Sequence, residues 1–286
     1  MAGEIRNSVN GLQTLCGGTR TTVKVDRPWQ PKMVFPTPNP CPFCTKKQED
    51  EYTYHPEDYF HCKTFQNSNT PFPYHRLLIP AVCWDEWTLR NLGGEDILKM
   101  MLSCALQEVK RTKEKFYPVW IFTHIGSGAG QNLTHNHWHL LAPPTDPKIF
   151  LKYDALGLIV SGEDILWRSW RLTVAVSGVR AGQTFIGPTR PKVNGIRTLS
   201  ARDVLENPSL FSELMEETYK LVMLFNDKFL NPDYCLLLAL NSEDDWHIRY
   251  TPILNNWGGS EFAALDYGTP FVLPWPHSET VKFLKS

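Results

Sequence analysis

Residues 126–141 read GSGAGQNLTHNHWHLL, a glycine-rich turn followed by histidines at alternate positions. Alternate residues of a β-strand share one face, so a strand here would place the side chains of His135, His137 and His139 together. Glycines adopt positive φ and let backbone amides approach an anion closely. The stretch therefore predicts imidazoles on one strand face, next to a turn suited to phosphate.

The flanking sequence predicts an α+β fold with antiparallel sheets and flanking helices. Strands are expected over 75–80, 117–123, 135–141, 167–175, 183–186, 234–240 and 247–253. Apolar residues at i, i+3 and i+4 spacing predict helices over 95–115 and 209–229. The order helix, strand, turn, strand occurs twice, which indicates two similar halves. We expect an N-terminal arm without regular structure over 1–25, a first half over 26–150 and a second half over 151–286.

Composition excludes several classes of protein. The 286 residues carry 29 basic and 30 acidic side chains with no long basic run, so neither nucleic acid nor a membrane is an expected partner. The N-terminus lacks the apolar core of a signal peptide, and no window of ~18 apolar residues follows, so a cytoplasmic protein is expected. Seven cysteines, an odd number, favour reduced, buried or metal-bound thiols over a disulfide framework.

Several segments of the chain resemble those of a known protein family. GAGQNLTHNHWHLL (128–141) resembles the signature of the histidine-triad (HIT) superfamily, in which alternate histidines follow a phosphate-binding loop. Further segments resemble its galactose-1-phosphate uridylyltransferase branch: DRPWQP (26–31), NPCPFC (39–44), NSNTPFPYHRLLIP (67–80), FNDKFLNPDYCLLLAL (225–240), DDWHIRYTPIL (244–254) and WGGSEFAALDYGTPFVLPWPHSE (257–279). The resemblance covers about residues 26–279 and implies two HIT-like halves, the first catalytic and the second degenerate.

The resemblance implies that His137 is a nucleophile that forms a nucleotidyl-histidine intermediate. A neutral imidazole, with a pKa near ~6.5, is a competent nucleophile at neutral pH. His139 would stabilise charge on the phosphate oxygens. The implied substrate-binding residues are Asn67, Gly128, Gly130, Gln131 and Asn132. Transferases and phosphorylases of the superfamily place Gln at the third histidine position and hydrolases place His, so His139 favours a hydrolase.

Chain length and the order of the segments favour transfer over hydrolysis. The implied function is a nucleotidyltransferase that moves a nucleoside monophosphate from a nucleotide sugar or a dinucleoside polyphosphate to phosphate or a sugar phosphate. Three alternatives remain open: a HIT-type hydrolase or phosphorylase, an inactive nucleotide-binding protein, and a catalytic metal site made by the three histidines. The sequence leaves open whether the protein is a homodimer.

Cys41-Pro-Phe-Cys44 has the C-x-x-C spacing that chelates a tetrahedral zinc, although a redox pair or incidental thiols fit the same spacing. The resemblance adds Cys83, which follows the Ile-Pro of the 67–80 segment, and His135. Together these residues imply a structural Cys3His zinc site. His75 is the alternative fourth ligand.

In the second half, the segment DDWHIRYTPIL aligns with a family segment that holds two metal-binding histidines separated by one residue. Here only His247 remains, and Arg249 occupies the other position. An arginine does not ligate a metal at neutral pH, so the family's second metal site is not expected. Two alternatives are that Arg249 binds substrate phosphate and that His247 is an ordinary core histidine.

Overall fold

The structure is a computed structural model. It describes residues 4–8, 20–24, 41–45, 51–54, 61–67, 74–81, 83, 94–112, 118–131, 133, 135–142, 164–176, 182–189, 199–240, 246–254 and 277–286. The elements are β1 (Glu4–Ser8), β2 (Arg20–Lys24), α2 (Pro42–Thr45), β3 (Tyr52–Tyr54), β4 (Cys62–Gln66), β5 (Tyr74–Pro80), α4 (Gly94–Thr112), β6 (Val119–Ile125), η1 (Ser127–Ala129), β7 (Trp138–Ala142), β8 (Ile165–Arg168), β9 (Leu172–Val176), β10 (Thr184–Pro188), α6 (Ala201–Glu206), α7 (Pro208–Phe229), β11 (Tyr234–Leu240), β12 (Trp246–Pro252) and α9 (His277–Lys285).

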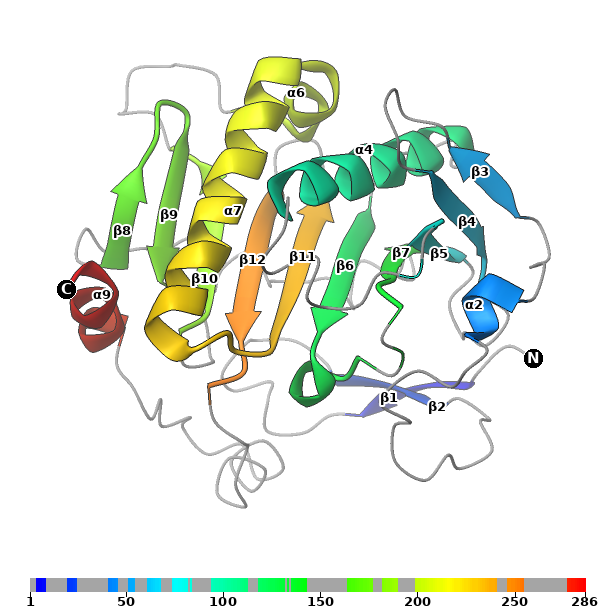
Figure 1. The fold of residues 1–286 in the computed structure, drawn as a ribbon, viewed down its shortest axis with the longest axis horizontal. Helices are drawn as coiled ribbons and strands as arrows, with labels where there is room; N and C mark the ends of the chain where they lie inside the picture. The colour runs from blue at the N-terminus through cyan, green and yellow to red at the C-terminus, as the bar shows by residue number, and fades with distance from the viewer. Residues whose placement is uncertain are drawn as a thin grey trace.

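Strands β3 to β12 form one antiparallel sheet in the order β3-β4-β5-β7-β6-β11-β12-β10-β9-β8 (Figure 1). The two halves have the same topology. In each half, three strands are followed along the chain by a long helix and then by two more strands. The last of these two strands lies nearer the edge of the sheet than the one before it, so β7 lies beside β5 and β12 beside β10. The predicted α+β architecture is therefore confirmed, and its topology repeats. The expected boundaries after residues 25 and 150 lie outside the described residues and stay predictions.

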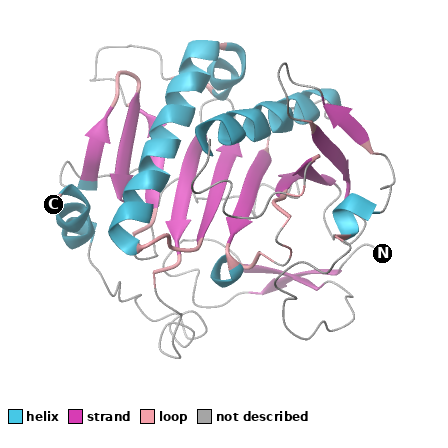
Figure 2. Ribbon diagram, viewed as in Figure 1, coloured by secondary structure: helices cyan, strands magenta, loops and turns pink. Residues whose placement is uncertain are grey.

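Helices α4 and α7 cover one face of this sheet, as Figure 2 shows by colour. Strand β6 alternates strictly: Val119, Ile121, Thr123 and Ile125 are buried on the helix side, whereas Trp120, Phe122 and His124 are half-buried on the other. Period-2 alternation thus gives the sheet an apolar helix-covered face and a second face with polar groups. Below, this second face is called the open face.

The long helices agree with their sequence signals. Helix α7 starts at Pro208, and the Asn207 side chain accepts hydrogen bonds from the N–H groups of Ser209 and Leu210. It ends at Phe229, and the following Leu230 adopts the left-handed conformation.

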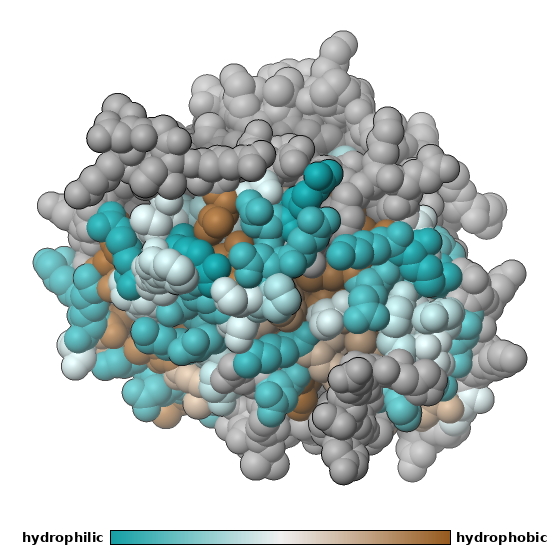
Figure 3. Space-filling model, turned by 90° about the horizontal axis from the view of Figure 1, so that it is seen from above, coloured by the Kyte–Doolittle hydropathy of each residue, from teal (hydrophilic) through white to brown (hydrophobic). Residues whose placement is uncertain are grey.

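Seen from above in Figure 3, the described part of the surface is mainly hydrophilic, with apolar side chains visible between polar ones. Among the described residues, no helix is long and apolar enough to cross a membrane.

Three local expectations need correction. The run 167–175 is split into β8 and β9, because Glu213 of α7 binds the Ser169 hydroxyl at 2.6 Å and the Arg171 backbone N–H at 2.9 Å and so fixes a turn there. Strand β7 begins at Trp138, so His135 and His137 precede it. The N-terminal arm contains regular structure after all, since β1 and β2 pair with each other.

Candidate functional site

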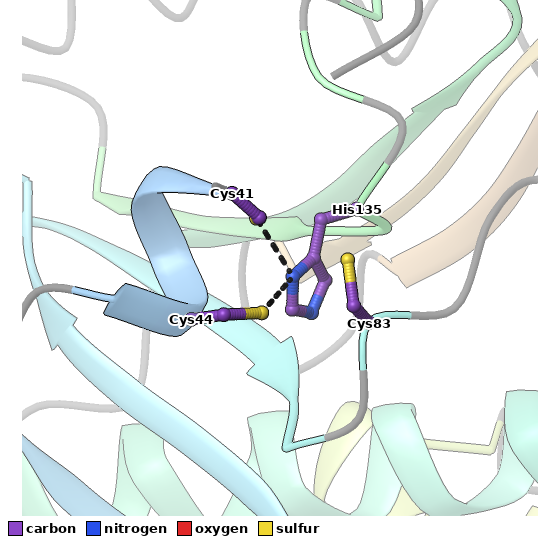
Figure 4. A group of neighbouring side chains, drawn as sticks. All are labelled: Cys41, Cys44, Cys83 and His135. Atoms are coloured by element: carbon purple, nitrogen blue, oxygen red, sulfur yellow. Dashed lines mark hydrogen bonds between the residues drawn. The ribbon is translucent and has the colours of Figure 1, made fainter. Parts of the chain in front are cut away.

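Four metal-ligating side chains from separate parts of the first half meet beside β7. The Sγ atoms of Cys41, Cys44 and Cys83 and a ring nitrogen of His135 all lie within 4.8 Å of one another (Figure 4). The Nδ1 atom of His135 is 3.4 Å from the sulfur of Cys41 and 3.4 Å from that of Cys44. The short helix α2 brings the first two thiols together, because the Cys41 carbonyl accepts the N–H of Cys44 at 3.1 Å. All four predicted ligands are thus in one cluster.

The orientation of His135 fits a metal ligand. Its Nε2 atom is 2.9 Å from the carbonyl oxygen of Pro80, which can only accept, so Nε2 carries the hydrogen. The lone pair on Nδ1 therefore faces the thiols, and a ligand histidine held through its other nitrogen is the usual arrangement at metal sites. Tetrahedral zinc with Zn–S distances of ~2.3 Å needs ligand atoms about 3.5–3.8 Å apart. The two distances of 3.4 Å from Nδ1 to the sulfurs of Cys41 and Cys44 are close to this spacing. The four side chains can hold a metal ion.

Burial and the neighbouring thiols disfavour the thiolate form of these cysteines. Burial, followed by the neighbouring Cys41, raises the pKa of the Cys83 thiol to about 12. Burial and Cys41 also raise the pKa of Cys44. A divalent cation stabilises thiolates and reverses such shifts, because metal binding releases the thiol protons.

His137 has one ring nitrogen held and the other left for chemistry. Its Nδ1 atom donates to the carbonyl oxygen of His135 at 2.9 Å, so the lone pair is on Nε2. The backbone of His137 is fixed in turn, since the Thr123 hydroxyl donates to its carbonyl oxygen at 2.9 Å. The side chain is 7% exposed, and burial lowers its pKa to about 4, so the ring is neutral at physiological pH. A neutral, oriented imidazole of this kind can act as a nucleophile.

His139 belongs to a second group of imidazoles, on the open face. Its Nδ1 atom is 2.9 Å from Nε2 of His75, and its ring stacks on Phe122 with centroids 4.8 Å apart at 9°. The ring centroid of His137 is 5.3 Å away, and that of His124 is 6.0 Å away. The three histidines at alternate positions are therefore divided: His135 faces the thiols, whereas His137 and His139 are neighbours at the open face.

His75 and Asn67 support this group from β5 and the end of β4. The Asn67 amide nitrogen lies 3.4 Å from both ring nitrogens of His75, and its backbone N–H donates to the His75 carbonyl at 2.9 Å. His75 is thus hydrogen-bonded to His139 and lies outside the cysteine cluster. The alternative that His75 is the fourth ligand of this cluster is therefore wrong. Asn67, predicted to bind substrate, lies next to the imidazoles.

The glycine-rich turn after β6 is closed by Gln131. The Gln131 side chain accepts the N–H of Gly126 at 2.7 Å through Oε1 and donates to the Leu133 carbonyl at 2.8 Å through Nε2. Gly126 and Gly130 have φ of 90° and 95°, the left-handed region that favours glycine. Gln131 thus shapes the turn, while Gly130 is exposed beside it. Asn132, the remaining predicted phosphate ligand, lies outside the described residues.

Asp233, directly before β11, contacts this turn, and the sequence did not predict it. Its Oδ2 atom accepts the N–H of Gly128 at 2.6 Å. This amide is a predicted phosphate donor, so a phosphate could use it only after the carboxylate moved away. No motif marked Asp233, since its contact depends on the pairing of β6 with β11.

Two further residues beside the imidazoles were also missed. The Nδ1 atom of His124 is 3.0 Å from the sulfur of Cys235, its partner in the β6–β11 ladder. Burial lowers the pKa of His124. The alternation of His124 with Phe122 on β6 was the one available signal for its place on the open face.

Replacement of Gly126 tests how tightly Asp233 and the turn are packed. A Cβ atom on Gly126 would lie 1.9 Å from Oδ1 of Asp233, whereas one on Gly130 would meet nothing within 4 Å. Both variants incur the left-handed strain of ~1–2 kcal/mol. Gly126→Ala should therefore lower the free energy of unfolding by an additional ~1–3 kcal/mol over Gly130→Ala, measured by urea denaturation. Equal losses in the two variants would contradict the packing described here.

No family model and no curated protein matches the chain. Among solved structures, an ADP-glucose phosphorylase from Arabidopsis thaliana with bound ADP-glucose matches with a TM-score of 0.61 and 12% identity over 99% of each chain. A uridylyltransferase matches with a TM-score of 0.58 and 14% identity over 95% of each chain. A yeast Ap4A phosphorylase in complex with Ap4A matches with a TM-score of 0.51 and 15% identity over 87% of this chain and 72% of that chain.

At these identities the likeness is one of fold. The chain has the fold of uridylyltransferase-like proteins, as the resemblance of its motifs predicted.

Proposed function

We propose that the protein is a nucleotidyltransferase that moves a nucleoside monophosphate through a nucleotidyl-His137 intermediate to a phosphate-bearing acceptor. The observation that carries the proposal is the orientation of His137, whose Nδ1–H is fixed on the His135 carbonyl at 2.9 Å so that the Nε2 lone pair is available. The donor would be a nucleotide sugar or a dinucleoside polyphosphate. Solved structures of the same fold that hold ADP-glucose and Ap4A support this class of donor.

The proposed reaction has two displacements. Nε2 of His137 attacks the α-phosphorus, an N–P bond forms, and the bond from phosphorus to the leaving-group oxygen breaks. An oxygen of phosphate or a sugar phosphate then attacks the same phosphorus, and the N–P bond breaks. In this proposal His139, whose Nδ1 atom lies 2.9 Å from Nε2 of His75, would stabilise charge on the non-bridging oxygens.

The cysteine cluster has a structural role in this proposal. We assign it zinc because three sulfurs and one imidazole nitrogen supply the four ligands of a closed structural zinc site, which would leave no position for substrate. The ion would tie α2 to the segment before β7. Phe43 of α2 contacts the rings of His135 and His137, with centroids 5.7 and 5.5 Å away. An ion that fixes α2 would therefore also help to fix the position of His137.

Hydrolysis is the second candidate, favoured by the histidine at position 139. Decay of the isolated adduct distinguishes the two reactions. A transferase must keep its nucleotidyl-histidine until the acceptor arrives, so we expect slow decay in buffer and much faster decay after addition of phosphate or a hexose 1-phosphate, followed by intact-protein mass spectrometry. Decay that is rapid in buffer and unchanged by either acceptor would make the protein a hydrolase and leave His137 as the nucleophile.

A further inference from the structure

In strand order and register, the two halves of the sheet are related by a pseudo-two-fold axis between β6 and β11. These strands have seven residues each, and their ladder is centred on the pair Phe122 and Leu237. One cross-strand row runs through this centre from β5 to β10: Leu77, His139, Phe122, Leu237, Arg249, Phe185. Arg249 therefore occupies in the second half the position that His139 occupies in the first, and His247 corresponds to His137.

The local packing of Arg249 differs from that of His139. The guanidinium carbon of Arg249 lies 4.9 Å from the ring centroid of Phe185 on β10, whereas the His139 ring stacks on Phe122 of β6 at 4.8 Å. The Nη2 atom of Arg249 is 3.3 Å from Nε2 of His247. A guanidinium only donates, so Nε2 of His247 accepts and this imidazole is neutral. His247 and Phe185 thus contact the permanently charged guanidinium of Arg249, which stands where the first half has the imidazole of His139.

Arg249 is half-buried on the same face as His139, opposite the helices. Three strand spacings of ~4.8 Å separate their strands, so the two residues are about 14 Å apart along the row. An oriented guanidinium suits the bidentate recognition of phosphate, and its partial burial strengthens the interaction.

We propose that Arg249, positioned by His247 and Phe185, binds a phosphate group at a second subsite on the open face, separate from the phosphorus attacked by His137. The phosphate is either a free anion or monoester, or the far phosphate of a ligand whose near end lies at His137. The assignment does not require His137 to react.

Calorimetric titration of the zinc-loaded full chain with inorganic phosphate, a nucleoside monophosphate and a dinucleoside polyphosphate tests this. We expect Arg249→Gln to weaken phosphate binding ~10- to 100-fold, the range for a lost charge-assisted contact, and Arg249→Lys to weaken it less. Arg168→Gln removes the same charge from an exposed position on β8 and should leave binding unchanged. Circular dichroism melting of each variant separates a lost contact from unfolding.

The ligand panel identifies the source of the phosphate. A loss for inorganic phosphate means a free anion, and a loss confined to the dinucleoside polyphosphate means the far phosphate of a bound ligand. The same titrations in a His137→Ala background show whether the subsite exists without nucleotidyl transfer. Folded Arg249→Gln protein that binds all three ligands as wild type does would overturn the assignment.

Discussion

Replacement of His137 with alanine is expected to abolish both turnover and the covalent nucleotide adduct. Removal of a nucleophile closes the two-step path, and the ring of His139 lies at a different position, stacked on Phe122 with its centroid 5.3 Å from that of His137. Intact-protein mass spectrometry after mixing with donor measures the adduct, and initial rates measure turnover. A melting curve checks that loss of this buried ring leaves the fold intact.

The matched variants are His139→Ala and His139→Gln. Loss of one charge stabiliser typically slows a reaction ~100- to 1000-fold, so His139→Ala should be slow but still form the adduct. Glutamine is the residue that transferases of the resembled superfamily carry at this position, so His139→Gln should retain more activity. Comparable residual activity in His137→Ala and His139→Ala would show that His137 is not the nucleophile.

Loss of either thiol of the C-x-x-C pair is expected to release the metal and destabilise the protein. We expect close to one zinc per chain, measured by elemental analysis, and its loss in Cys41→Ser and Cys44→Ser, since both sulfurs lie 3.4 Å from Nδ1 of His135. Structural zinc binding is coupled to folding, so the melting temperature should fall clearly in both variants. Cys83→Ser should retain zinc less tightly than the wild type.

The control for this experiment is Cys235→Ser. Cys235 lies 3.0 Å from His124 on the open face and outside the cysteine cluster, so its variant should keep the zinc. A wild-type protein that is purified without metal and melts at the same temperature with and without a chelator would rule out a structural zinc site.

Local pattern was sufficient to predict the long elements. The helical apolar spacing located α4 and α7, and the runs 75–80, 234–240 and 247–253 predicted β5, β11 and β12 to within a residue or so. The grouping of Cys41, Cys44, Cys83 and His135 was also predicted, because the motif resemblance pointed to the residue after Ile79-Pro80 and to the first histidine after the glycine turn.

Contacts that depend on tertiary structure were not predictable from local pattern. The break between β8 and β9 is set by Glu213, more than forty positions away along the chain. Asp233 and Cys235 reach the glycine turn and His124 only because β11 pairs with β6. The late start of β7 has a similar origin, since His135 is held by the thiols and the Pro80 carbonyl outside the β7 ladder.

The pairing of β6 with β11 also has a consequence for how the chain folds. Synthesis releases Val119–Ile125 long before Tyr234–Leu240, so β6 first forms an edge strand whose N–H and C=O groups on the β11 side are unpaired. Such an edge readily joins strands of other chains, and long-range pairing of this kind forms slowly. Until the second half is synthesised, the first half therefore carries an edge strand that is prone to aggregation, and pairing with β11 covers this edge.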